Sequence, residues 1–244
     1  MKSVLITGAN RGLGLGMVKF LTKNTKVENI FATCRNVSEE LKNISETNKN
    51  VHILHLEAAD VASFDNLFPQ ISKVTGDQGL NLLINNAGTS TKFTKLNLVK
   101  PEQLLSNLTI NTIAPIILTK SLLPLLKQAA QNNSDKPVGV GRAVVINMSS
   151  VLGSIAQNDV GGFYAYRCSK AALNAATKSM SIDLKKDHIL VASMHPGWVR
   201  TDMGGKKAPL DVDTSVAGMF STIQKLTEAD SGKFLQYDGS ELPW

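Results

Sequence analysis

The sequence has little of what marks secreted, membrane-spanning or metal-dependent proteins. Its two cysteines, Cys34 and Cys168, have no metal-ligand spacing and cannot build a disulfide framework, so we expect two reduced thiols, with Cys168 buried. No apolar run approaches the roughly 18 residues that a membrane span needs, and the apolar run after Met1 is too short for a signal peptide. These absences predict a cytoplasmic protein with no membrane partner.

The pattern of charges and the spacing of the histidines argue against a nucleic-acid partner and a metal site. The net charge is +6, but the lysines are scattered and no aromatic residues are interleaved with them. This pattern argues against a nucleic-acid partner and suits a phosphate-bearing small molecule equally well. The four histidines share no metal spacing, so no metal site is predicted, and His195 is interpreted as a packed residue at the end of a strand.

Short runs rich in β-branched residues recur along the chain. They are near-continuous rather than alternating, which is typical of strands buried on both faces of a parallel sheet. They occur at residues 3–7, 30–34, 51–56, 82–85, 143–148 and 189–194, with a weaker one at 233–236. Helical patterns lie between them, at residues 12–23, 38–46, 64–73, 102–131, 166–186 and 214–227. The alternation predicts an α/β fold over residues 1–244: one domain, with a doubly wound, Rossmann-type parallel sheet of about seven strands and helices on both faces.

The first predicted strand ends in a glycine-rich turn that leads directly into an apolar helix. Its sequence is TGANRGLG, with the spacing GxxxGxG from Gly8 to Gly14. Glycine lets the backbone turn tightly and approach a pyrophosphate, which then accepts hydrogen bonds from the free N–H groups at the start of the helix. A plain structural turn is the alternative, but the strand before it and the helix after it favour a dinucleotide site.

Two arginines bear on the choice of dinucleotide. Arg35 follows the second predicted strand, and Arg11 lies inside the glycine-rich turn. An acidic residue at the end of the second strand would bind a free 2′-hydroxyl of the adenosine ribose, whereas an arginine accommodates a 2′-phosphate. Guanidinium groups suit phosphate oxygens, so the two residues predict NADPH; a solvated surface charge is the alternative for either one alone.

A tyrosine and a lysine four residues apart indicate acid–base chemistry. Tyr166 and Lys170 share one face of a predicted helix, where the ammonium can stabilise the phenolate form of the tyrosine. Tyr166 is therefore a predicted acid–base residue. The alternative is an exposed pair on a helix surface with no chemical role.

Two further polar positions fit such a site. Ser149 and Ser150 follow the fifth predicted strand, where a hydroxyl can hydrogen-bond a substrate carbonyl; a capping role is the alternative. Asn111 lies four residues before Pro115, and a proline inside a helix frees the carbonyl at i−4 to bind a water. For Asn111 the alternative is that it merely tolerates the kink.

Several ordered motifs at strand ends resemble the short-chain dehydrogenase/reductase family over nearly the whole chain. After the TGANRGLG turn come Asp60-Val61, Asn85-Asn86-Ala87-Gly88, Asn111, Ser149-Ser150, Tyr166-Arg167-Cys168-Ser169-Lys170 and Pro196-Gly197-Trp198-Val199-Arg200-Thr201. Each motif is common alone, but their order makes the match specific. Within the family, the opening turn and the stretch GGFYAYR at residues 161–167 look most like the sniffer-type carbonyl reductases.

The resemblance implies a role for each of these positions. The implied catalytic set is Asn111, Ser150 rather than Ser149, Tyr166 and Lys170. Ser150 lies sixteen residues before Tyr166, a few more than is usual in the family, which leaves the shape of the substrate pocket open. The implied cofactor-binding residues are Gly8, Asn10, Arg11, Gly12, Leu13, Gly14, Arg35, Asp60, Val61, Asn86, Ala87, Gly88, Tyr166, Lys170, Pro196, Gly197, Val199 and Thr201, with Asp60 at the adenine edge.

The function that the resemblance implies is reduction of a small-molecule aldehyde, ketone or quinone to an alcohol, with NADPH/NADP+ as cofactor and Tyr166 as the proton donor to the carbonyl oxygen. The resemblance also implies a homodimer formed through the helix of Tyr166 and the long helix before it. One alternative is an NAD-dependent alcohol or steroid dehydrogenase, which Arg35 disfavours. The other is a non-catalytic NADPH-binding sensor or scaffold, against which the complete Asn-Ser-Tyr-Lys set argues.

Overall fold

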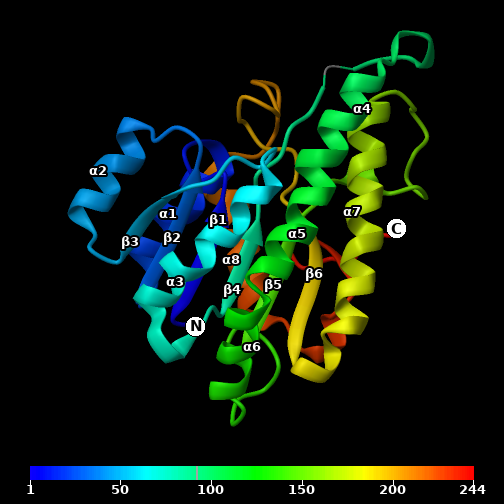
Figure 1. The fold of residues 1–244 in the computed structure, drawn as a ribbon. Helices are drawn as coiled ribbons and strands as arrows, with labels where there is room; N and C mark the ends of the chain where they lie inside the picture. The colour runs from blue at the N-terminus through cyan, green and yellow to red at the C-terminus, as the bar shows by residue number, and fades with distance from the viewer. Residues whose placement is uncertain (92) are drawn as a thin grey trace.

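Seven strands alternate with helices in the computed structural model, which describes residues 1–91 and 93–244 (Figure 1). The strands are β1 (Ser3–Thr7), β2 (Asn29–Cys34), β3 (Val51–His55), β4 (Leu82–Asn85), β5 (Ala143–Met148), β6 (Ile189–His195) and β7 (Phe234–Gln236). Each pairs in parallel with its neighbours, in the order β3-β2-β1-β4-β5-β6-β7. The predicted doubly wound parallel sheet is confirmed.

Helices cover both faces of this sheet. One layer contains α1 (Gly12–Asn24), α2 (Glu39–Thr47) and α8 (Val212–Lys225). The other contains α3 (Leu67–Thr75), α4 (Pro101–Leu108), α5 (Ala114–Ser121), α6 (Leu123–Asn132) and α7 (Tyr164–Asp183), and α4 and α7 run side by side (Figure 1). The reversal of strand order between β1 and β4 opens the crevice in which ligands of such sheets bind.

The burial of β1 explains why the strand sequences are continuously apolar. Val4 and Ile6 belong to the apolar cluster under α1 and α8, whereas Leu5 belongs to the cluster under α3, α5 and α6. All three side chains are fully buried. Successive strand residues point to opposite faces, so a sheet covered on both faces needs an apolar residue at every position.

The prediction of one continuous helix over residues 102–131 is wrong. The segment consists of α4, a π-helical turn (Thr109–Ile113), α5 and α6. Pro115 has no N–H to donate to the Asn111 carbonyl, and the Ala114 N–H bonds the Thr109 carbonyl five residues back. A second proline, in the first turn of α6, allows a new helix to start there. The proline that the sequence pointed to therefore widens the helix at Asn111.

A chain of polar side chains crosses the carboxyl ends of three central strands. Asn85 Nδ2 donates to Asn147 Oδ1 over 2.8 Å, and Asn147 Nδ2 donates to Thr177 Oγ1 over 2.9 Å. Ser193 Oγ donates to the same Thr177 oxygen over 2.9 Å. All four residues are buried. This polar ladder joins β4, β5 and β6 to α7, the helix that carries Tyr166 and Lys170.

The sequence also led to expectations about the thiols, a metal site and membrane-spanning helices. Both cysteines are free, and Cys34 is buried. Cys168 is exposed, contrary to prediction. It lies two residues after Tyr166 on α7, and a step of two residues places a side chain on the opposite side of a helix. Across residues 1–91 and 93–244, no group of three or more His, Cys, Asp or Glu could hold a metal ion. In the same residues no single helix is long and apolar enough to cross a membrane; Pro101–Ser121 and Leu123–Asn132 meet the criterion only as a pair bent by 55°.

Candidate active site

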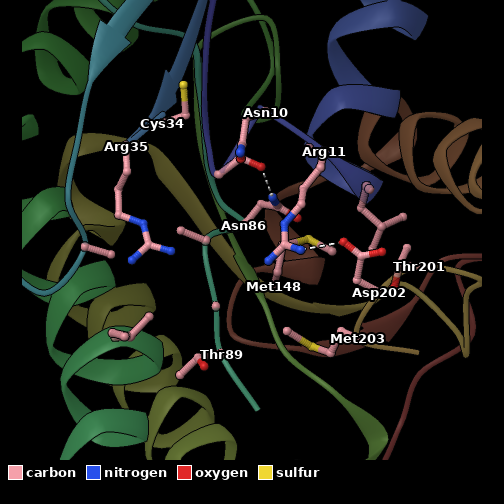
Figure 2. Close-up of a pocket in the computed structure, with 18 of the residues that line it drawn as sticks. Asn10, Arg11, Cys34, Arg35, Asn86, Thr89, Met148, Thr201, Asp202 and Met203 are labelled. Atoms are coloured by element: carbon pink, nitrogen blue, oxygen red, sulfur yellow. Dashed lines mark hydrogen bonds and ion pairs between the residues drawn. The ribbon is translucent and has the colours of Figure 1, made fainter. Parts of the chain in front are cut away.

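A cavity of about 630 Å³ opens at the carboxyl ends of the central strands, at the switch point between β1 and β4 (Figure 2). It brings together residues from the glycine-rich turn, the ends of β2 and β4, the start of α7 and the segment after β6. The predicted residues that line it are Gly8, Asn10, Arg11, Gly12, Leu13, Gly14, Arg35, Asn86, Ala87, Gly88, Tyr166, Lys170, Pro196 and Thr201.

The glycine-rich turn has the backbone geometry that its sequence predicts. Gly8 and Gly12 lie at φ +67° and +54°, where other residues are strained. Gly14 lies so close to Gly8 that an added Cβ would overlap the Gly8 carbonyl oxygen. The turn therefore leaves its peptide groups and the start of α1 open to the cavity, which is what a pyrophosphate requires.

Thr7 holds this turn against β4, a role that the sequence analysis did not foresee. Its Oγ1 accepts hydrogen bonds from the Asn86 N–H over 2.9 Å and the Ala87 N–H over 2.8 Å. Asn86 Nδ2 in turn donates to the Thr7 carbonyl over 2.8 Å. A threonine at the end of an otherwise apolar strand was the available signal. The three residues fix the two sides of the crevice relative to each other.

Both predicted arginines line the cavity, and each has an acidic partner. Arg35 lies 3.4 Å from Glu57, which follows β3, and Arg11 forms an ion pair with Asp202 in the segment after β6. All four side chains are solvent-exposed to some degree, so neither pair is strongly held. The sequence analysis named neither acid, because no local pattern links them to the arginines.

The dinucleotide predicted from sequence fits these residues. The glycine-rich turn offers a cradle that an added Cβ would fill, and the start of α1 attracts an anion. Two guanidinium groups in the same cavity match the additional phosphate of NADPH. Residues 34–36, at the end of β2, are Cys-Arg-Asn and contain no acid to bind a free 2′-hydroxyl.

Tyr166 lies in the first turn of α7, which begins two residues earlier than predicted. The helix starts after Phe163, whose φ of +49° is left-handed and which follows Gly161 and Gly162. Desolvation raises the pKa of the Tyr166 phenol, and a hydrogen bond with the Ser150 side chain acts against that increase. The phenol therefore keeps its proton at neutral pH and is oriented by the predicted serine.

Lys170 lies one turn further along α7 and is buried. Its Nζ donates to the Met148 carbonyl at the end of β5 over 2.7 Å and lies 5.7 Å from the centre of the Tyr166 ring. Burial lowers the pKa of Lys170 to about 8. The predicted placement of an ammonium beside the phenol is thus present in the structure.

Asn111 is fully buried behind the cavity. Its side chain donates to the Thr89 carbonyl over 2.8 Å and to Ser169 Oγ over 2.9 Å, and accepts from the Thr89 N–H over 2.8 Å. Ser169 Oγ donates to the Tyr166 carbonyl over 2.8 Å. The side chain thus joins the segment after β4 to α7, while the π-helical turn leaves the main-chain carbonyl of Asn111 without its usual helical donor, Pro115.

The remaining predicted residues lie around the cavity rather than in its lining. Asp60 is exposed and precedes a 3₁₀ turn that begins at Val61. Gly197 packs against Leu210, and buried Val199 pairs with that same residue. The cofactor roles implied for these four remain predictions. His195 is buried and its pKa is lowered to about 4, as expected for a neutral, packed residue.

The pH dependence of activity should reflect Lys170. Below about pH 8 the Lys170 ammonium is charged and stabilises the phenolate that forms when Tyr166 gives up its proton. As pH rises through that pKa the charge is lost, so we expect kcat/KM for carbonyl reduction to fall above about pH 8. A pH–rate profile measures this, and in Lys170→Arg, whose guanidinium does not titrate in the range, the residual activity should lack the fall. A wild-type profile that stays flat through pH 8 contradicts the assignment.

Comparison with known proteins places the chain among short-chain dehydrogenases. Residues 2–210 match the family described as short chain dehydrogenase, and the chain belongs to that family. The carbonyl reductase Sniffer of D. melanogaster is 51% identical, with a TM-score of 0.98 and complete coverage of both chains. The NADPH-bound carbonyl reductase from chicken fatty liver is 38% identical over 100% of this chain and 99% of the other, with a TM-score of 0.93.

A third relative is named for another property. The C-signal protein of Myxococcus xanthus is 42% identical over 165 residues, which cover 68% of this chain and 93% of that protein. The resemblance to sniffer-type carbonyl reductases that the sequence showed is confirmed by the two structures. An NADPH-dependent oxidoreductase is the class of enzyme that the family and its solved members support.

Proposed function

We propose that this chain reduces the carbonyl group of a small aldehyde, ketone or quinone to an alcohol with NADPH. The observation that carries the proposal is the group formed by Tyr166, Ser150 and Lys170 beside the cavity that the glycine-rich turn lines. A phenol that keeps its proton is suited to protonating an oxygen, which is the direction of reduction. Both carbonyl reductases compared above have the same fold over their full length.

The chain's own residues supply binding, orientation and the proton. NADPH, when bound, supplies the hydride. The turn from Gly8 to Gly14 and the start of α1 would hold its pyrophosphate, and Arg35 and Arg11 would hold its 2′-phosphate. Lys170 and Asn86 lie on the wall of the same cavity and limit how the ligand can be oriented.

Proton transfer follows from the contacts around Tyr166. The Ser150 hydroxyl and the Tyr166 phenol both donate to the substrate oxygen, which polarises the carbonyl and stabilises the charge that develops there. Tyr166 then gives its proton to that oxygen, and the Lys170 ammonium stabilises the phenolate left behind. The Asn111 carbonyl, to which Pro115 cannot donate, is suited to bind a water through which the proton is replaced from solvent.

The assembly is proposed to be a homodimer in the cytoplasm. Support comes from exposed apolar side chains on the outer helices that pack side by side: Leu105 on α4, Ile113 beside α5 and Ile182 on α7. Their exposed fractions are 65%, 43% and 65%. Sedimentation equilibrium distinguishes a dimer from a monomer of 26.3 kDa.

The function is tested by following the oxidation of NADPH and of NADH by absorbance, with a panel of quinones, aromatic aldehydes and ketosteroids. Turnover with NADPH and a carbonyl compound is the expected result. Preference for NADH would favour the NAD-dependent dehydrogenase alternative. Tight NADPH binding with no turnover on any member of the panel would favour the sensor alternative.

A further inference from the structure

Two opposite charges meet at the mouth of the cavity from distant parts of the chain. Arg11 belongs to the glycine-rich turn and Asp202 to the segment after β6, and 191 positions separate them. Figure 2 shows the Arg11 side chain directed at Asp202, while Arg35 extends from the other side of the cavity. Both Arg11 and Asp202 line the cavity, and their side chains are 67% and 76% exposed.

Contacts of the residues around Asp202 place the segment that carries it. Thr201 Oγ1 accepts a hydrogen bond from the Gly204 N–H over 3.1 Å, and the Thr201 carbonyl accepts one from the Gly205 N–H over 2.8 Å. The Thr201 side chain also lies beside Gly12, within van der Waals reach of a Cβ built there. The turn after β6 is thus packed on the glycine-rich turn, and Asp202 faces Arg11 as a consequence.

The pairing creates a conflict for Arg11. Arg11 Nη1 donates to one carboxylate oxygen of Asp202, and this negative charge offsets the attraction of one of the two cations available to the 2′-phosphate of NADPH. Arg35 has a comparable partner in Glu57, at 3.4 Å, and its guanidinium is directed into the cavity. Asp202 is the acid that faces Arg11 at the mouth of the cavity.

We infer that Asp202 competes with the 2′-phosphate of NADPH for Arg11 and thereby sets both the affinity for NADPH and its selection over NADH. The inference rests on the proposed NADPH site and adds a specificity-determining residue to it. An exposed ion pair is worth about 0.2 to 1 kcal/mol, so its removal should tighten NADPH binding by about 1.4- to 5-fold. NADH, which has no 2′-phosphate, should gain less.

The test is a double-mutant cycle on cofactor affinity. Dissociation constants for NADPH and NADH are measured by calorimetry at low ionic strength in wild type, Asp202→Asn, Arg11→Ala and the double variant. Asp202→Asn should bind NADPH about 1.4- to 5-fold more tightly than wild type. In the Arg11→Ala background the same substitution should have little effect. Asp135→Asn is the control, because it removes an equal charge from an exposed position in the loop between α6 and β5.

Several outcomes overturn the inference. Unchanged or weaker NADPH binding in Asp202→Asn would show that the acid does not compete for Arg11. An equal gain for NADH would assign the effect to the pyrophosphate, and an equal gain in the Arg11→Ala background would assign it to direct repulsion. If wild type binds neither dinucleotide, the proposed function fails together with the inference. Normal NADPH binding by wild type with no gain in the variant rejects the inference alone.

Discussion

Replacing Tyr166 with phenylalanine should lower kcat for carbonyl reduction by about 100- to 10,000-fold and leave the dissociation constant for NADPH nearly unchanged. The variant keeps the ring beside Lys170 but removes the only proton that the side chain can give. Phenylalanine keeps the aromatic ring, so the ring packing stays intact. The phenol hydroxyl is lost together with its hydrogen bond to the Ser150 side chain, and the substrate oxygen loses a donor. Steady-state kinetics and NADPH titration separate the two effects.

Tyr164→Phe is the matched control, since it makes the same change in the same helical turn at a side chain that does not line the cavity. It should retain activity close to wild type. Activity of Tyr166→Phe within a few-fold of wild type would remove Tyr166 from the role of proton donor. A loss of both activity and NADPH binding would instead indicate a damaged site.

Replacing Arg35 with alanine should weaken NADPH binding by about 10- to 150-fold and change NADH binding little. The basis is that hydrogen bonds to a charged group are worth about 1.5 to 3 kcal/mol, and Arg35 is a cation directed into the cavity at the end of β2. The ratio of the two dissociation constants is the quantity to compare, because it cancels any general change in the site.

Lys26→Ala serves as the control for net charge in that experiment. Lys26 is exposed and lies before β2, at the opposite end of the strand from Arg35. The control should leave both dissociation constants unchanged. An equal loss of NADPH and NADH affinity in Arg35→Ala would mean that the arginine supports the pocket in general and does not read the 2′-phosphate.

The strands and the cavity could be predicted because local signals determine them. A strand covered on both faces must be apolar throughout, so the runs at residues 3–7, 82–85 and 143–148 match β1, β4 and β5 in full. Parallel strands end at a common edge, which is why motifs that follow different strands meet there. The spacing of Tyr166 and Lys170 needed only a helix to bring the two side chains together.

Contacts between distant segments could not be predicted from the sequence. Glu57 and Asp202 meet their arginines only in the assembled sheet, and no spacing in the sequence indicates either ion pair. The π-helical turn at Asn111 could be predicted only in part. Pro115 indicated a disturbed helix, but the sequence did not indicate which hydrogen bonds would replace the missing one. Cys168 was misplaced because burial depends on which side of α7 faces the sheet, and an apolar residue type alone does not decide that.

The polar ladder described above has a consequence for the accuracy of assembly. Val, Ile and Leu residues pack almost as well when one parallel strand shifts along another, so apolar runs distinguish correct from shifted pairing only weakly. A shift of β5 by one position would turn Asn147 to the other face of the sheet and leave Asn85 and Thr177 without their shared partner. Each buried polar group left unpaired costs about 1 to 3 kcal/mol, so a shifted sheet is less stable than the correctly paired one. Correct strand alignment thereby becomes a precondition for a correctly placed Tyr166.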